Sequence, residues 1–331
     1  GRIPMKIKKE YIVLAAVIVA LSVYLSARET DRTQYSLPEL AGLSQEDITR
    51  VEITRPEGSV VLERDGEEWR IEPEGHRADA DRMKDILRTI AELTLTAMVS
   101  ESKNYSRYNL GSENGIAVKA WSGDTLLREF RVGKPATSFR HTFVRLEGND
   151  RVFHARENFR NRFETTASEL RDKTVLAFDQ DEIREMHIEK GKESVTLVRE
   201  IEPVEPLESK SGETEKSPLP AAGTAEETWM TPEGASADVL QLDRMLRALS
   251  SLECEKFLED RRREEFETPV YRIRLVGTDT YTLDIFPREN DEQKAYPALS
   301  SQNPDPFLLP GRKAEVLMKT PGDILDKSGD T

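Results

Sequence analysis

The sequence predicts an α+β fold in which two tandem repeats, each an antiparallel sheet or meander with one main amphipathic helix, follow a single N-terminal transmembrane helix. Three observations predict it. A helical pattern of apolar residues occurs twice, at 78–93 and at 237–252. Runs that alternate between apolar and polar residues surround both copies. An uncharged apolar run lies near the N-terminus, at 11–27.

Both predicted helices are amphipathic, and they match each other at one offset. In the first copy the apolar residues recur every three or four positions and so share one helix face: Met83, Ile86, Leu87, Ile90 and Leu93. An offset of 159 residues pairs these and other positions with the second copy: Ala78 with Ala237, Asp79 with Asp238, Met83 with Leu242, Leu87 with Leu246, Ile90 with Leu249 and Leu93 with Leu252. Because a solenoid needs three or more short repeats, two long copies indicate a duplicated domain.

The similarity extends upstream of the helices. A strand with a tryptophan precedes each helix, at 68–75 and at 228–234. Each copy starts with two further strands, 47–54 and 59–64 in the first and 181–189 and 194–199 in the second. An acidic insertion at about 200–227, with four prolines and a net charge of −6, separates the second set of strands from its tryptophan. Such a segment buries too little apolar surface to offset its ordering entropy, so we predict a disordered hairpin loop.

These patterns predict the domain boundaries. They are a cytoplasmic tail and transmembrane signal anchor at 1–30, a linker at 31–46, the first repeat at 47–177 and the second repeat at 178–328. In the first repeat, downstream of the helix, alternating runs at 115–121, 126–132, 141–146 and 151–154 are separated by turn residues. Consecutive strands of this kind predict an antiparallel meander rather than alternating strands and helices.

The N-terminal run allows two interpretations. Lys6, Lys8 and Lys9 precede it, which places the N-terminus in the cytoplasm and the bulk of the chain outside, in the periplasm of a bacterium. A cleaved signal peptide is the alternative, but Leu25 stands where a cleavage site has a small residue. We therefore favour an uncleaved signal anchor and a single-pass protein of the inner membrane.

The composition restricts the class of partner. The net charge is −14, whereas proteins that bind nucleic acid through its phosphates present a basic surface. The prediction is therefore no nucleic-acid partner. Cys254 is the only cysteine, so no intrachain disulfide is possible, and we expect it to be a small buried apolar residue.

No catalytic or metal-binding motif is complete in the sequence. Gly133 and Lys134 resemble part of a phosphate-binding loop, but Arg128 and Pro135 stand where that loop has glycine and serine or threonine. The four histidines lack the spacing of metal ligands. We expect no cofactor, no metal and no catalytic residue.

Six arginines within a short segment form the candidate binding site. They are interleaved with phenylalanines: Arg140, Arg145, Arg151, Arg156, Arg160 and Arg162. One interpretation is a basic face for an anionic partner, such as phospholipid headgroups, a glycan or an acidic protein. The other places the phenylalanines in the core and the arginines in solvent beside acidic neighbours. We favour the second and keep the first as the candidate site.

Several of these residues carry a resemblance to a known family. The pattern comprises Gly133 before His141-Thr-Phe-Val-Arg145, then Phe159 and Phe163, Leu170-Arg-Asp-Lys173 and Leu176-Ala-Phe-Asp179. It resembles DUF4340, a bacterial domain of unknown function, over the first repeat and the start of the second. The second repeat departs from the pattern at Lys294–Ala298. The resemblance implies an anchored envelope protein encoded beside ABC-transporter components related to gliding-motility export, and it carries no catalytic residue.

The expected function is a non-enzymatic, single-pass inner-membrane protein with an extracytoplasmic module that binds protein or polymer. Its partners would be subunits of an ABC-type transport system in the envelope. Two alternatives stay open. One is an envelope hydrolase with a site built from scattered residues such as His141, His154 and Glu157, which a concave pocket around these side chains would favour. The other is a structural spacer in the periplasm.

Overall fold

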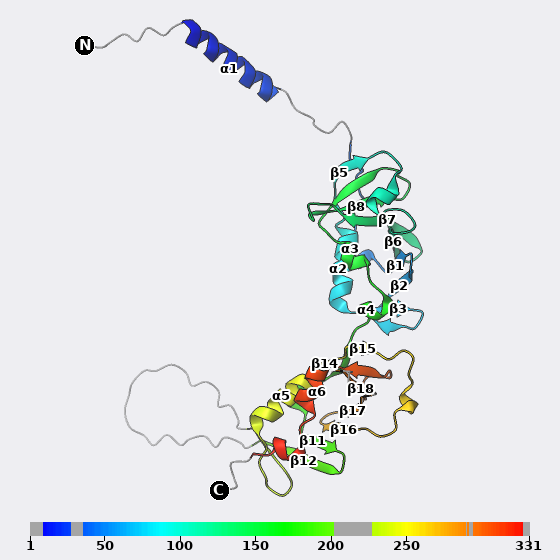
Figure 1. The fold of residues 1–331 in the computed structure, drawn as a ribbon, viewed down its shortest axis with the longest axis vertical. Coiled ribbons are helices and arrows are strands. Elements are labelled where there is room, and N and C mark those ends of the chain that lie inside the picture. Colours follow the sequence, from blue (N-terminus) through cyan, green and yellow to red (C-terminus); the bar gives the residue numbers. More distant parts are fainter. Residues whose placement is uncertain (1–8, 28–35, 202–226, 289, 291–293, 327–331) are drawn as a thin grey trace, which may run out of the picture. The chain divides into compact units, whose positions relative to one another are not determined.

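The computed structural model describes residues 9–27, 36–201, 227–288, 290 and 294–326 (Figure 1). Contacts between residues divide the chain into two compact units. The first unit comprises residues 1–64 and 84–165, and the second comprises residues 65–83 and 166–331. The predicted insertion at about 200–227 lies outside the described residues except at its ends, as does the tail at 1–8.

The predicted α+β class is wrong, because the described residues form mostly antiparallel sheet with few helices. The two predicted amphipathic helices exist, but each has only 12 residues. The other helices apart from the N-terminal one have four to seven residues. The alternating runs, by contrast, pair into long ladders, so the sheets and not the helices account for the greater part of the fold.

A sheet of nine strands has the order β4-β3-β2-β1-β6-β7-β8-β9-β5. Its strands are β1 (Arg50–Arg55), β2 (Gly58–Asp65), β3 (Glu68–Glu72), β4 (His76–Arg77), β5 (Leu95–Ser100), β6 (Ile116–Ser122), β7 (Thr125–Pro135), β8 (His141–Leu146) and β9 (Val152–Arg156). The four strands β6 to β9 form the predicted meander. β5 was not anticipated, and it pairs with β9 at the end of the sheet.

A sheet of eight strands has the order β13-β12-β11-β16-β17-β18-β19-β15. Its strands are β11 (Glu185–Lys190), β12 (Glu193–Ile201), β13 (Glu227–Met230), β15 (Lys256–Phe257), β16 (Tyr271–Val276), β17 (Thr280–Ile285), β18 (Tyr296–Ser300) and β19 (Phe307–Leu309). A separate two-stranded sheet pairs β10 (Thr174–Ala177) with β14 (Ser251–Glu253). The eight-stranded order repeats the nine-stranded order without β4, with each strand in the corresponding place along the chain. This correspondence supports an internal duplication, which, with the proposed boundaries at 47–177 and 178–328, stays a prediction.

Seven helices and four 3₁₀ turns accompany the sheets in the part of the chain that the structure describes. The helices are α1 (Lys9–Ala27), α2 (Ala80–Ala91), α3 (Arg160–Phe163), α4 (Ala167–Leu170), α5 (Val239–Ser250), α6 (Gly311–Leu317) and α7 (Pro321–Ile324). Single 3₁₀ turns are η1 (Gln45–Asp47), η2 (Tyr105–Tyr108), η3 (Gln180–Glu182) and η4 (Arg263–Glu265). The Asp79 carboxylate accepts the Arg82 N–H at 2.9 Å at the start of α2, and Asp238 accepts the Gln241 N–H at 3.0 Å at the start of α5.

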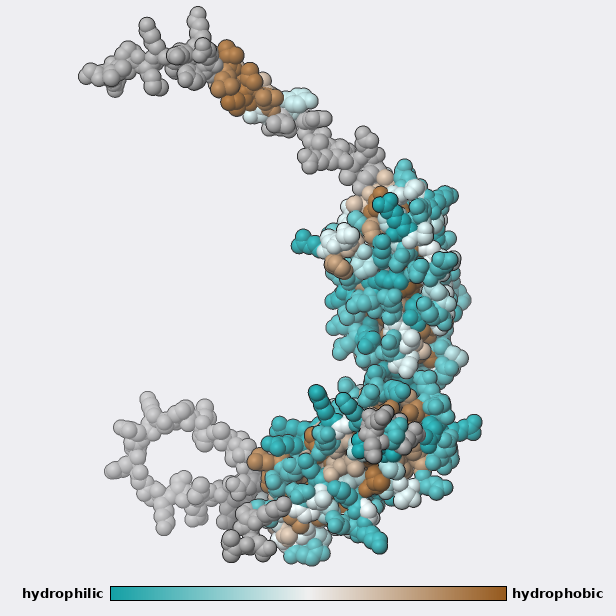
Figure 2. All heavy atoms as spheres, viewed as in Figure 1, coloured by the Kyte–Doolittle hydropathy of each residue, from teal (hydrophilic) through white to brown (hydrophobic). Residues whose placement is uncertain are grey.

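The predicted transmembrane helix is also wrong: among the described residues, no helix is both long and apolar enough to cross a membrane. The apolar run does form a helix, and its described side chains are exposed and mostly apolar (Figure 2). The helix has 19 residues and begins with Lys9 and Glu10, so its uncharged part is shorter than the roughly 20 residues that a spanning helix uses.

The two amphipathic helices bury the matching positions of their apolar stripes. Leu87 is 8% exposed and Leu246 is 7% exposed. The tryptophans of the preceding strands, Trp69 and Trp229, are buried as well. The visible surfaces of the units are mostly hydrophilic (Figure 2), as expected for helices and sheets that bury one face.

Two backbone contacts fix the start of each of these helices, and all of them lie within the second unit. The Ala78 N–H donates to the Trp69 carbonyl, and the Asp79 N–H donates to Leu170, both at 2.8 Å. The same pattern recurs later in the chain, where Ala237 donates to Trp229 at 2.8 Å and Asp238 donates to Ile324 at 2.7 Å. Each helix N-terminus is thus held between its tryptophan strand and the short helix α4 or α7.

Candidate functional site

A polar cleft of about 720 Å³ opens in the second unit, and we call it the Arg171 cleft. Three segments that are distant in the sequence line it. They contribute Arg70, Glu74, Gly75, His76 and Arg77 from the β3–β4 hairpin, Arg171, Asp172, Thr174, Val175 and Ala177 from β10 and the residues before it, and Gln302, Asn303, Pro304 and Asp305 from the loop after β18.

The hairpin wall is positioned by a tight turn between β3 and β4. Gly75 has φ +71°, a left-handed conformation that glycine adopts without steric cost, and its N–H donates to the Ile71 carbonyl at 2.9 Å. Arg70 lies opposite Arg77 across the hairpin, and buried Ile71 lies opposite His76. The turn therefore presents both arginines and the histidine from one short hairpin.

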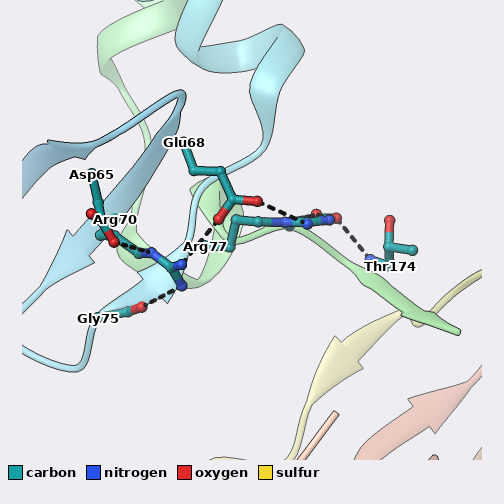
Figure 3. A network of polar contacts seen from close by, with 7 residues as sticks. Asp65, Glu68, Arg70, Gly75, Arg77 and Thr174 are labelled. Atoms are coloured by element: carbon teal, nitrogen blue, oxygen red, sulfur yellow. Dashed lines mark hydrogen bonds and ion pairs between the residues drawn. The ribbon is translucent and has the colours of Figure 1, made fainter. Parts of the chain in front are cut away.

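Arg77 and Asp172 form the central ion pair of the cleft. Figure 3 shows Arg77 with its second carboxylate partner, Glu68. The Arg77 Nε–H donates to the Asp172 carboxylate at 2.7 Å, and the Thr174 N–H donates to its other oxygen at 2.9 Å. Burial alone would raise the pKa of Asp172, but these hydrogen bonds and the guanidinium charge outweigh burial and hold the pKa below its usual range. Asp172 is therefore a carboxylate with both oxygens engaged.

The other two arginines of the cleft also have carboxylate partners. Arg70 contacts Glu68 at 3.0 Å and Asp65 at 3.6 Å, as the dashed lines in Figure 3 show for Asp65. The Arg171 guanidinium, whose side chain is 7% exposed, pairs with Asp305 and lies 3.4 Å from the centre of the Phe257 ring. Each positive charge in the wall is thus neutralised locally.

Asp305 also faces a histidine. Its carboxylate lies 3.6 Å from His76 Nε2. Glu74, His76, Arg171 and Asp305 line, in addition, a neighbouring cavity of about 330 Å³. The Arg171 cleft and this neighbouring cavity therefore share one polar wall.

Side chains occupy the edge of β10 that faces the cleft. The Ala177 N–H donates to Gln302 Oε1 at 2.6 Å, and Gln302 Nε2 donates back to the Ala177 carbonyl at 2.9 Å. The Ser300 hydroxyl donates to the buried Val175 carbonyl. Because β14 pairs with the other edge, the groups of β10 are satisfied on both sides. The cleft as a whole is polar and balanced in charge, which suits binding through hydrogen bonds.

The structure disperses the six predicted arginines over the first unit. Arg140 lies in the turn between β7 and β8, and Arg145 lies 4.7 Å above the Tyr105 ring. Arg151 contacts Glu101 at 3.3 Å. Arg160 donates to the Asn114 carbonyl at 2.9 Å and contacts Glu164 at 3.3 Å.

Only Arg156 and Arg162 come together, in a cavity of about 140 Å³ that Arg88 also lines. Arg162 donates to Thr89 Oγ1 at 2.7 Å and contacts Glu157 at 3.1 Å. Four of the six arginines, Arg145, Arg151, Arg160 and Arg162, lie within 4 Å of a carboxylate. The proposed anionic-partner face stays a prediction, and Arg140 and Arg156 are its members without an ion pair among the described residues.

The residues of the hydrolase alternative are partly brought together. The rings of His141 and His154 stack with centroids 5.3 Å apart, and Phe143 packs against His154 at 4.8 Å. Glu157, by contrast, pairs with Arg162, and the cavity that it lines includes neither histidine. Among the described residues, no group of three or more His, Cys, Asp or Glu side chains is placed to hold a metal ion. Cys254 is buried, and burial raises the pKa of its thiol to about 11.

We expect His154 to make stability depend on pH. Burial, and then the neighbouring His141, lower its pKa below the ordinary 6.5. At pH values between the lowered pKa of His154 in the folded chain and the ordinary 6.5, the unfolded chain binds more protons than the folded chain. The free energy of unfolding therefore falls as pH decreases through about 6.5. Denaturant unfolding of the wild type and His154→Gln at several pH values checks this. The variant should lose part of the pH dependence, and identical slopes would contradict the assignment.

The residues of the Arg171 cleft were not predicted, because they come from three segments that are far apart in the chain, at 70–77, 171–177 and 302–305. One local signal was present: Arg171 and Asp172 belong to the segment Leu170-Arg-Asp-Lys173, which is part of the pattern that resembles DUF4340. Arg171 is nearly buried and paired with Asp305, as buried arginines generally are, and this pairing is visible only in the structure.

Comparison with known proteins gives one match. A family model described as a domain of unknown function, DUF4340, matches residues 69–269. The match includes the hairpin wall and the Arg171-Asp172 pair of the cleft, and it ends before the loop at 302–305. No curated protein and no solved structure matches the chain.

Proposed function

Because this chain belongs to the DUF4340 family, whose function is unknown, we propose a role on the basis of the cleft. The chain is a binding module, not an enzyme, that holds a segment of protein or envelope polymer in the Arg171 cleft. It acts outside the cytoplasm as an accessory of an ABC-type transport system in the cell envelope. The cleft supports the binding role, and the resemblance to family members beside transporter components supports the location and the partner.

One observation carries the binding role: a polar cleft of about 720 Å³ whose arginines are already paired with carboxylates. The size falls within the range of about 300–1,000 Å³ that ligand sites usually have. Since Arg77 and Arg171 each have a carboxylate partner, an anionic ligand would compete with Asp172 or Asp305 for them. An uncharged polar segment, such as a peptide backbone or a sugar chain, can use the remaining donors and acceptors without separating these pairs.

Photo-crosslinking from the cleft tests this role, and the chain supplies a matched control. Glu74 is exposed, lines the cleft and lies in a Pro-Glu-Gly turn. Glu233 is exposed in the same Pro-Glu-Gly sequence before α5, and it is not part of the cleft lining. A photoreactive amino acid at Glu74 should give a discrete crosslinked product in cells, and the same residue at Glu233 should not. Identical products from both positions, or none from Glu74, would show that the cleft is not the binding site.

The location is tested separately. We expect a reporter that is active only outside the cytoplasm to be active when fused after Thr331, because the proposed partners are envelope components. Activity of the reporter in whole cells is the measurement. An inactive fusion that is nevertheless made in full length would place the module in the cytoplasm and contradict this part of the proposal.

A further inference from the structure

The turn that joins β7 and β8 holds a bulky aromatic residue in a conformation that favours glycine. The Ala136 N–H donates to the His141 carbonyl at 2.8 Å and closes the hairpin, and the Phe139 N–H donates to the Ala136 carbonyl at 2.8 Å. The backbone of Phe139 has φ +55°, in the left-handed region that bulky residues rarely adopt. Its side chain is 72% exposed, so packing within the chain does not explain the residue. Backbone strain at a residue whose side chain is not buried indicates a functional position.

Cations surround this turn and lack carboxylate partners. Lys134, Arg140 and Arg156 are exposed, and among the described residues none of them makes an ion pair. Arg156 lies directly opposite His141 in the β8–β9 register, next to the turn. The chain has 62 acidic residues, yet none occurs between Glu129 and Glu147. We call Lys134, Phe139, Arg140 and Arg156 the Phe139 tip.

We propose that the Phe139 tip inserts into the surface of an anionic phospholipid bilayer. An exposed apolar side chain flanked by cations is the pattern of interfacial membrane contacts, in which the ring enters the acyl boundary and the cations meet the headgroups. The net charge of −14 does not oppose this, because charges farther away than about 8–10 Å are screened at physiological salt. A protein partner fits less well, since stable protein interfaces cover about 800 Å² on each side, and the turn between β7 and β8 has only five residues.

The experiment uses the full chain with a fluorophore that reports on its surroundings. Thr137→Cys places the label in the turn, and Asp124→Cys places it in the exposed β6–β7 turn at the other end of β7 as a control. Cys254 is buried with a raised thiol pKa, so it stays unlabelled. With vesicles of phosphatidylcholine and phosphatidylglycerol in equal parts, the emission at Thr137 should shift to the blue and its quenching by iodide should fall. Vesicles of phosphatidylcholine alone should cause neither change, and the label at Asp124 should not respond to either lipid.

Two variants connect the response to the proposed residues. Phe139→Gly removes the ring and suits the backbone conformation, so it should abolish the blue shift without lowering the free energy of unfolding. Lys134→Glu with Arg140→Glu should abolish it as well. A label that stays in water with anionic vesicles, a response equal in both lipids, or a full response in Phe139→Gly would overturn the proposal. The first of these results would favour an acidic protein groove as the partner of the tip. The outcome is independent of the Arg171 cleft.

Discussion

Replacing Gly133 by alanine is expected to destabilise the chain by about 3 kcal/mol or more, the upper part of the range for overpacking. Gly133 lies in β7 where the backbone of the η2 segment approaches closely. A Cβ atom at this position would lie 2.3 Å from the Tyr108 carbonyl oxygen and 3.0 Å from Leu110 Cγ. Since the first contact is with a backbone atom, the clash can be relieved only if the backbone around Tyr108 moves.

Gly111, in the loop between η2 and β6, provides a control. A Cβ atom there meets nothing within 4 Å, and the backbone is not left-handed. Gly111→Ala should therefore stabilise the chain by about 0.4–1 kcal/mol, because alanine restricts the unfolded state. Denaturant unfolding of both variants is the measurement. A Gly133→Ala protein as stable as Gly111→Ala would mean that the close approach to Tyr108 is absent in solution.

Truncating the central leucine of either amphipathic helix should cost about 2–5 kcal/mol. Leu87 in α2 and Leu246 in α5 are buried at matching positions. Removal of either side chain leaves a cavity in a core that collapses only in part. Unfolding of Leu87→Ala and Leu246→Ala, each followed by denaturant titration, gives the two values.

The neighbouring arginines are the matched controls. Arg88 contacts Asp85 at 2.8 Å and Arg247 contacts Asp243 at 2.9 Å, both at exposed positions. Their replacement by alanine should cost less than about 0.5 kcal/mol. The comparison also bears on duplication, because unrelated helices have no reason to bury the same positions. A large loss for Leu87→Ala beside a negligible loss for Leu246→Ala would contradict the equivalence of the two copies.

Local patterns in the sequence predicted local structure well. The periodicity at 78–93 and 237–252 corresponds to α2 and α5, and the run at 141–146 coincides with β8. These elements were predictable because side-chain period alone distinguishes a half-buried helix from a half-buried strand. The predicted α+β class was wrong because it gave the two clear helical patterns as much importance as the many strands. β5, at Leu95–Ser100, was missed since only part of it alternates in burial.

The site could not be predicted in the same way. Asp305 meets Arg171 and His76 only after β18 and β10 are in place, and no local pattern encodes contacts over such separations. The arginine cluster at 140–162 shows the reverse case, in which residues that are close in sequence have different surroundings. Its members are close in sequence, but β8, β9 and α3 point them at different partners, such as Tyr105 for Arg145 and Thr89 for Arg162. The close approach behind Gly133 is likewise visible only in three dimensions.

Filling the Arg171 cleft with a large side chain shows whether the cleft is the binding site. Glu74→Trp places a large side chain at the wall of the Arg171 cleft, and Glu233→Trp places the same side chain in the equivalent Pro-Glu-Gly turn away from it. The measurement is the affinity of each purified full-length variant for the molecule crosslinked from Glu74. We predict binding weakened by roughly tenfold or more for Glu74→Trp, equivalent to about 1.4 kcal/mol, and unchanged binding for Glu233→Trp. Equal affinities of the two variants and the wild type would contradict the assignment of the cleft as the binding site.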